Sequence, residues 1–236
     1  EACKCPRKKG EKALKWPLFP KIPAEKNFSA SYRVHVHQPE ARELFGHQFK
    51  EFLKREYPLE RPLVILCIGT DRSTGDSLGP LIGSKLQAAG STLFQVYGTL
   101  EKPVHAVNLE ETTVQIHRRF HRPYIVAVDA CLGKAESIGY ITIKLGPLQP
   151  GTGVNKSLPA VGNLHVVGVV NVGGFMEYLV LQNTRLNLVM QMAEVISDGL
   201  LQGCQMFFPE NRPAIIENTR ESTRAHETGL TPVFSE

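Results

Sequence analysis

The sequence predicts an α/β fold in three layers, with a mainly parallel central sheet and helices on both of its faces. Short apolar runs alternate along the chain with segments that carry apolar residues at helical spacing. The run at 124–129 is apolar up to a terminal Asp129, as expected for a strand that is buried on both faces. A chain of 236 residues with 42% hydrophobic and 21% charged residues is sufficient for one domain with a real core.

The individual elements follow from these patterns. The segment 40–56 places Leu44 and Phe49 on one apolar stripe with charges opposite, which indicates a helix. Asn108 with Glu111 resembles a capping box at the start of a later helix. The predicted strands are 32–37, 63–68, 93–97, 124–129, 138–145 and 164–171, and the predicted helices are 40–56, 76–89, 108–120 and 175–201.

The two ends of the chain differ in composition from its middle. Residues 1–27 are rich in Lys and Pro without sustained periodicity, and we expect a disordered basic arm. Residues 28–208 carry the patterns of a single α/β domain, and 209–236 form a polar tail. The net charge is +4, and the excess lies in the arm, so the domain itself is close to neutral. This balance argues against a dedicated nucleic-acid surface on the domain.

The cysteine content and the hydropathy indicate whether disulfides and membrane-spanning segments are expected. The five cysteines are odd in number and two lie in strand-like apolar runs, so a disulfide framework is not expected. No apolar run reaches the ~18 residues of a membrane span, and no signal-peptide core is visible. We therefore expect a soluble, cytoplasmic protein without a membrane partner. Homo-oligomerisation stays open.

Residues 65–80 carry the strongest functional signal. An apolar strand breaks at Gly69 into a polar loop that holds Asp71 and Asp76, and a helical pattern follows. Asp129 ends a later strand. Because loops that follow parallel strands emerge at the same edge of a sheet, Asp76 and Asp129 are expected to converge there.

Two adjacent carboxylates have a definite chemistry. They repel each other, so one keeps its proton near neutral pH while the other is ionised. Such a pair can act as general acid and general base on a water molecule, or it can ligate a metal. Each acid also has a structural alternative, because Asp76 stands where a helix N-cap belongs and Asp129 could satisfy loop amides. Asp71 is expected to fix the turn at 73–75.

Other candidate residues have weaker signals. His165, near the start of the last strand, is either a structural histidine or a third ligand beside the acids. His105 and Glu101 follow the third predicted strand, 93–97, and could line the opening of the same site. Cys67 and Cys131 flank the expected site, where buried thiols without a histidine partner are usually packing residues. The chain has no G-x-G-x-x-G, no G-x-x-x-x-G-K-[ST] and no G-x-S-x-G motif.

Several motifs resemble those of one family, the YyaC sporulation proteins of spore-forming Firmicutes. The resemblance extends over about residues 40–205 and leaves the two tails unexplained. The motifs are CIGTDRSTGDSLGP at 67–80, VYGTLEKPVHAVNL at 96–109, VDACLG at 128–133, PGTGVNK at 150–156 and GVVNVGG at 168–174.

The YyaC proteins are similar in turn to the spore germination protease and the hydrogenase maturation endopeptidases, which share an α/β fold. The resemblance implies that Asp76 and Asp129 match the proposed catalytic aspartates of the germination protease. In the hydrogenase branch, equivalent acids and a histidine contact nickel in the substrate. Thr70 stands where that branch usually has Asn, and His165 aligns only loosely with its histidine. The loop at 150–156 is more similar to the germination protease, which favours a metal-free dyad.

We therefore expect a sporulation-associated endopeptidase of atypical aspartic type, located in the cytoplasm of the mother cell or the forespore. It would hydrolyse a protein or peptide substrate without a cofactor. The alternatives are a non-catalytic protein that binds peptides on the same fold and a metal-dependent maturation protease acting on a nickel protein. The residues expected to contact substrate are Gly69, Thr70, Gly98, Thr99, Gly153 and Asn155.

Overall fold

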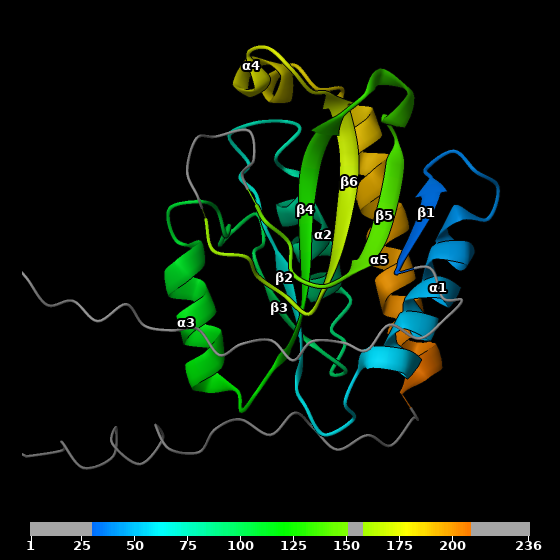
Figure 1. Cartoon of the computed structure of the whole chain (residues 1–236), viewed down its shortest axis with the longest axis vertical. Helices are drawn as coiled ribbons and strands as arrows, with labels where there is room; N and C mark the ends of the chain where they lie inside the picture. Colours follow the sequence, from blue (N-terminus) through cyan, green and yellow to red (C-terminus); the bar gives the residue numbers. More distant parts are fainter. Residues whose placement is uncertain (1–29, 151–157, 209–236) are drawn as a thin grey trace, which may run out of the picture.

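The computed structural model describes residues 30–150 and 158–208, in which six strands form one sheet with the order β1-β5-β6-β4-β2-β3 (Figure 1). The strands are β1 Ser31–His35, β2 Leu63–Cys67, β3 Gln95–Tyr97, β4 Tyr124–Gly133, β5 Tyr140–Leu145 and β6 Leu164–Val172. The helices are α1 Ala41–Glu56, α2 Leu78–Ala88, α3 Leu109–Arg119, α4 Glu177–Gln182 and α5 Leu186–Phe207, with a 3-10 turn at Ala135–Ser137.

The sheet combines parallel and antiparallel pairings. β2 pairs in parallel with β3 and β4, and β4 pairs in parallel with β6. β5 is antiparallel to both β6 and β1, so the antiparallel strands lie together on one side of the sheet. The predicted α/β class is confirmed, with the parallel pairings at β6, β4, β2 and β3, where the functional signals were expected.

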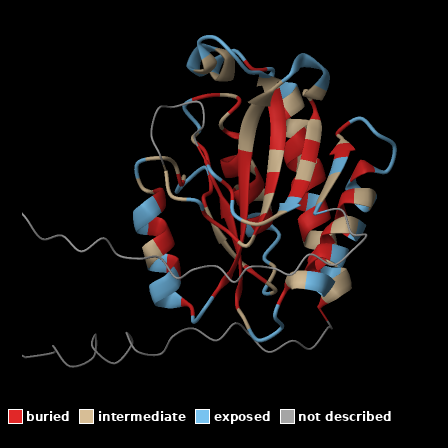
Figure 2. Ribbon diagram, in the orientation of Figure 1, coloured by how far each residue is buried: buried red, intermediate tan, exposed pale blue. Residues whose placement is uncertain are grey.

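Both faces of the sheet are covered, because alternate residues of the central strands point to opposite sides. In β2, Leu63 and Ile65 join the apolar core formed with α1, α2 and α5, whereas Val64 and Leu66 join the second core under α3. Figure 2 shows the resulting pattern, with buried residues along the central strands and exposed ones on the outer sides of the helices. The predicted three-layer arrangement is therefore confirmed.

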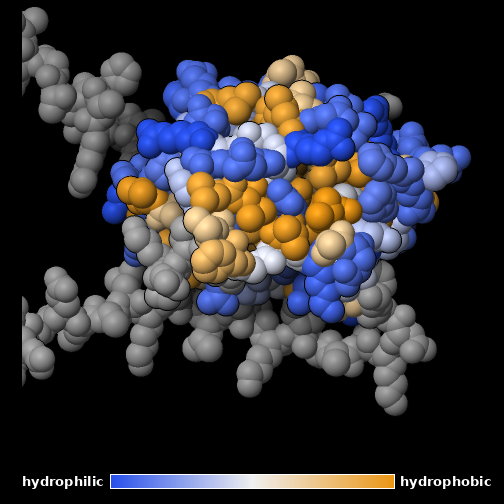
Figure 3. Space-filling model, turned by 90° about the horizontal axis from the view of Figure 1, so that it is seen from above, coloured by the Kyte–Doolittle hydropathy of each residue, from blue (hydrophilic) through white to orange (hydrophobic). Residues whose placement is uncertain are grey.

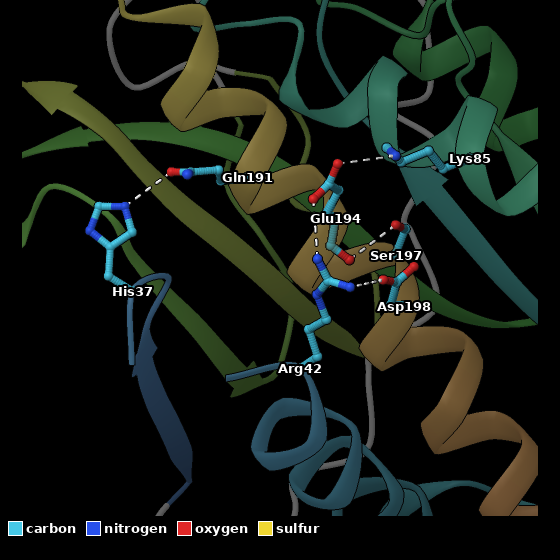
Figure 4. Close-up of polar contacts among 7 residues, drawn as sticks. All are labelled: His37, Arg42, Lys85, Gln191, Glu194, Ser197 and Asp198. Atoms are coloured by element: carbon cyan, nitrogen blue, oxygen red, sulfur yellow. Dashed lines mark hydrogen bonds and ion pairs between the residues drawn. The ribbon is translucent and has the colours of Figure 1, made fainter. Parts of the chain in front are cut away.

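Ion pairs join α5 to its two helical neighbours at the surface. Arg42 of α1 lies 3.2 Å from Glu194 and 3.2 Å from Asp198, both in α5 (Figure 4). Lys85 of α2 lies 3.9 Å from the same Glu194. Exposed pairs of this kind contribute at most about 1 kcal/mol each, so the apolar contacts below them hold the layer together.

Two predicted elements differ from the structure. The strand predicted to end at Asp129 continues to Gly133, because Asp129 and the residues after it pair with β6 as far as Val172. The single helix predicted for 175–201 is divided into α4 and α5. Asn183 Nδ2 donates to the Leu179 carbonyl at 2.8 Å and Thr184 Oγ1 to the Val180 carbonyl at 2.9 Å, so these side chains end the helix. The other boundaries shift by one or two residues.

The predicted basic arm at 1–27 and the polar tail at 209–236 lie outside the described residues. Within the described ranges, none of the helices has the length and apolar character needed to cross a membrane.

Candidate functional site

The loop after β2 folds back on itself and carries Asp76 over the end of the strand. Gly69 adopts a φ of 143°, and a Cβ at this position would lie 2.0 Å from the Asp76 carbonyl oxygen. The Thr70 amide donates to the same carbonyl at 3.1 Å. Gly79 allows α2 to pack directly on β2, since a Cβ there would lie 2.0 Å from the Ile68 carbonyl oxygen. Two glycines therefore fix where the Asp76 backbone lies.

Asp129 lies in β4 with its side chain on the α3 side of the sheet. Alternate residues of a strand point to the same face, so Asp129 lies on the face of Ile125 and Ala127, which belong to the core under α3. The residue is only 8% exposed, and its Oδ1 accepts a hydrogen bond from the Ala130 amide at 2.8 Å. Asp76 and Asp129 line the same cavity, of about 410 Å³. The structure thus brings the two acids together.

The environment of the two acids gives them different affinities for a proton. Burial raises the pKa of Asp129 well above its usual range, and the negative charge of Asp76 raises it further. Burial also raises the pKa of Asp76, but the Thr70 amide and the positive charge of His105 act in the opposite direction. Asp76 therefore ionises first, while Asp129 keeps its proton.

The simpler structural roles do not account for the loop acids. Ser77, not Asp76, occupies the N-cap of α2, and it makes no side-chain capping bond. Asp71 is exposed, and none of the described residues hydrogen-bonds to its carboxylate, so the role expected for it is not observed. Ser77 holds the turn instead, with its amide donating to the Ser73 carbonyl at 3.0 Å and its hydroxyl to the Thr74 carbonyl at 2.7 Å.

His105 lines the cavity of the two acids, as its weaker signal in the sequence allowed. Its backbone is fixed by Asn108, whose Oδ1 accepts from the His105 amide at 2.8 Å. The Asn108 amide group donates to the Pro103 carbonyl, so the predicted capping box does not form. When the ring is neutral, Nδ1 of His105 accepts a hydrogen bond from the Val107 amide at 3.3 Å.

The residues expected to contact substrate separate into three groups. Gly69 and Thr70 line the cavity of the acids. Gly98 and Thr99 line a different, larger depression of about 840 Å³ along β3, between α2 and α3. Gly153 and Asn155 lie outside the described residues.

His165 lies apart from the two acids. It is in β6, its Nδ1 lies 2.9 Å from the Gly146 carbonyl oxygen, and it does not line the cavity. Glu101 does not line it either. Across residues 30–150 and 158–208, no three His, Cys, Asp or Glu side chains are grouped closely enough to hold a metal ion. Within the described residues, His165 is therefore not grouped with Asp76 and Asp129 as the hydrogenase branch implies.

The two cysteines beside the site are poor nucleophiles. Cys131 lines the cavity, but burial and the neighbouring charge of Asp129 raise the pKa of its thiol to about 11. Cys67 is fully buried in β2, and burial raises its pKa as well. Since the thiolate is the reactive form, the environment of these two cysteines does not activate them as nucleophiles at neutral pH.

Replacing His105 tests its electrostatic contact with Asp76. His105→Gln keeps a polar side chain but removes the positive charge, so the pKa of Asp76 is expected to rise. Carboxyl carbon NMR of protein with labelled aspartate measures this titration directly. The control His165→Gln changes a ring outside the cavity and should leave Asp76 unaffected. An unchanged Asp76 titration in the His105 variant would show that His105 has no electrostatic effect on Asp76.

Comparisons with known proteins agree with the motifs. Residues 33–199 match the family described as "Protein of unknown function (DUF1256)". The chain is 61% identical over 140 residues to "Uncharacterized protein YyaC" of Bacillus subtilis (strain 168), which covers 59% of this chain and 68% of that protein. Among solved structures, the [NiFe] hydrogenase maturation protease HycI from Thermococcus kodakarensis KOD1 matches with a TM-score of 0.41 and 15% identity, over 65% of this chain and 99% of HycI. The chain is therefore a member of the DUF1256 family and a relative of YyaC, as the motifs predict.

Proposed function

We propose that the protein is an endopeptidase in which Asp76 and Asp129 activate water against a peptide carbonyl. The observation that carries this proposal is that Asp76 and Asp129 line one cavity in different environments. Asp76 ionises more readily, and Asp129 holds its proton more strongly. An ionised base beside a protonated acid is the arrangement that general acid–base hydrolysis requires. The association with sporulation, and a cytoplasmic location in the mother cell or forespore, are proposed from the sequence resemblance.

The reaction has two steps. The Asp76 carboxylate takes a proton from water while the water oxygen bonds to the carbonyl carbon, and the Asp129 carboxyl gives its proton to the carbonyl oxygen. In the second step the proton held by Asp76 passes to the leaving nitrogen and the C–N bond breaks. The carbonyl forms again and a hydroxyl proton returns to Asp129. Both acids end in their starting states, so the cycle needs no other reactant.

The apolar lining of the cavity supports this assignment. Apart from the two acids, aliphatic side chains are the largest group in its walls, and the other ionisable residues are Arg72, His105, Cys131, Glu177 and Tyr178. In apolar surroundings the charge and the hydrogen bonds of the acids act more strongly on a bound carbonyl than in water.

Cleavage of a peptide library tests the proposal. We expect the full-length protein to generate new termini in a proteome-derived peptide library or in an extract of sporulating cells, identified by mass spectrometry. The reaction should proceed without added metal. Peptides that are bound but never cut would favour the non-catalytic alternative and overturn the assignment as an enzyme.

A further inference from the structure

A buried hydroxyl beside the cavity has no hydrogen-bond partner within the described protein. Ser73 is 6% exposed, and no described residue is placed to hydrogen-bond its Oγ. Ser77, in the same loop and 7% exposed, differs because its hydroxyl donates to the Thr74 carbonyl at 2.7 Å. An unpaired buried hydroxyl costs folding free energy, so such groups are rare in native proteins. The position of Ser73 is explained if a ligand completes its hydrogen bonding.

Ser73 and Asp76 are neighbours along the wall of the cavity. They lie in one turn of the loop, which is closed by the hydrogen bond from the Ser77 amide to the Ser73 carbonyl, and both line the cavity. The end of α4 covers this turn, since the Gly75 amide donates to the Leu181 carbonyl at 2.9 Å. A group bound to the acids therefore lies beside Ser73, whose hydroxyl can reach it by rotation about the Cα–Cβ bond.

The aliphatic part of the cavity wall continues onto an apolar surface. Its aliphatic residues include Leu132, Leu148, Leu158, Val167 and Leu181. At the rim, Val107 is 81% and Tyr178 64% exposed. Beyond the rim, Phe175, Met176 and Leu179 are also exposed. Figure 3, which views the molecule from the α4 end, shows apolar surface gathered on this side. Exposed apolar surface that adjoins a cavity is typical of a binding site.

We infer that this cavity binds an extended polypeptide by a large apolar side chain next to the bond held by Asp76 and Asp129, with Ser73 hydrogen-bonded to the backbone of that polypeptide. A peptide unit offers the Ser73 hydroxyl both a donor and an acceptor directly beside an apolar side chain. A chain longer than the cavity also accounts for the apolar surface that continues along α4. This inference rests on the proposed function and names its substrate class.

Peptide binding tests the inference without requiring cleavage. The full-length protein with Asp129→Asn is titrated with fluorescein-labelled, end-blocked Ala-Ala-Phe-Ala-Ala and with the matching Gly peptide, and anisotropy is recorded. We expect the Phe peptide to bind at least about tenfold more tightly, because burying its side chain is strongly favourable. Ser73→Ala in this background should weaken binding by about three- to tenfold and raise the unfolding temperature, since it removes an unpaired buried hydroxyl.

Two further variants complete the test. Ser77→Ala is the matched control: it should bind like the parent and unfold at a lower temperature, because it removes a satisfied hydrogen bond. Val107→Ser changes an exposed side chain that the core does not need, and it should also weaken binding of the Phe peptide. Equal binding of the Phe and Gly peptides, or parental affinity in both the Ser73 and Val107 variants, would overturn the inference. Binding as expected in a protein that never cleaves peptides would leave the inference standing and defeat only the proposed function.

Discussion

Replacement of Asp129 by Asn is expected to reduce peptide hydrolysis by about 10²–10⁴-fold while the protein remains folded. The amide has nearly the shape of the protonated carboxyl that burial favours at this position, but it cannot pass a proton to the substrate oxygen. The rate of appearance of new peptide termini measures the loss, and circular dichroism checks the fold. Asp71→Asn is the control, because this exposed acid of the same region does not line the cavity. Hydrolysis at the parental rate in the Asp129 variant would exclude the mechanism.

The same substitution should change how stability depends on pH. The pKa of Asp129 is raised in the folded state, so the folded protein binds this proton more tightly than the unfolded chain does. Its contribution to stability is complete below about pH 4, where the unfolded carboxyl is also protonated, and it declines as the pH rises through the folded pKa. The unfolding free energy of the Asn variant minus that of the parent should therefore be larger at pH 8 than at pH 4. Urea unfolding at the two pH values measures this difference. A difference in the opposite direction would show that Asp129 is stabilised in its ionised form.

Gly98→Ala is expected to cause the largest loss of stability, more than about 4 kcal/mol, or to prevent folding. Gly98 has a φ of +86°, and a Cβ there would lie 1.8 Å from the Cys67 carbonyl oxygen at the end of β2. The backbone of two adjacent strands would have to separate, directly below the loop that carries Asp76. Urea unfolding, or the yield of soluble protein, measures the effect.

Gly90→Ala is the matched control for the Gly98 substitution. Gly90 also has a positive φ, +63°, but nothing lies within 4 Å of its added Cβ. Its substitution should cost only the conformational strain of the left-handed region, about 1–2 kcal/mol. Equal losses for the two variants would mean that the close approach at Gly98 is not required.

The sequence predicts the layers of this fold and the convergence of the two acids of the candidate site. The physical reasons can be seen at particular residues. The buried runs at 63–67 and 124–129 are recognisable because strands covered on both faces need apolar side chains throughout. The convergence of Asp76 and Asp129 follows from the parallel pairing of adjacent strands, because that pairing places the loops on one edge.

Other features depend on contacts that no local pattern contains. The role of Gly98 as a packing residue arises from its contact with Cys67, 31 positions away in the chain. His105 enters the site because Val104 pairs beside Ile68, beyond the end of β3, which is a tertiary contact. The unpaired hydroxyl of Ser73 can be identified only when the neighbouring atoms are known.

The extension of β4 beyond Asp129 has a consequence for how the two acids move. Asp129 is paired with Val167 of β6, and the pairing continues at Ala130 on its carboxyl side. Backbone in the middle of a central sheet exchanges its amide hydrogens mainly through global unfolding, whereas loops exchange through small local openings. Asp76 lies in such a loop, tied by the Gly75 amide to α4. The two acids are therefore held in different ways, Asp129 by the strand pairing of the sheet and Asp76 by the hydrogen bonds of a loop, and amide hydrogen exchange should be slower at Asp129 than at Asp76.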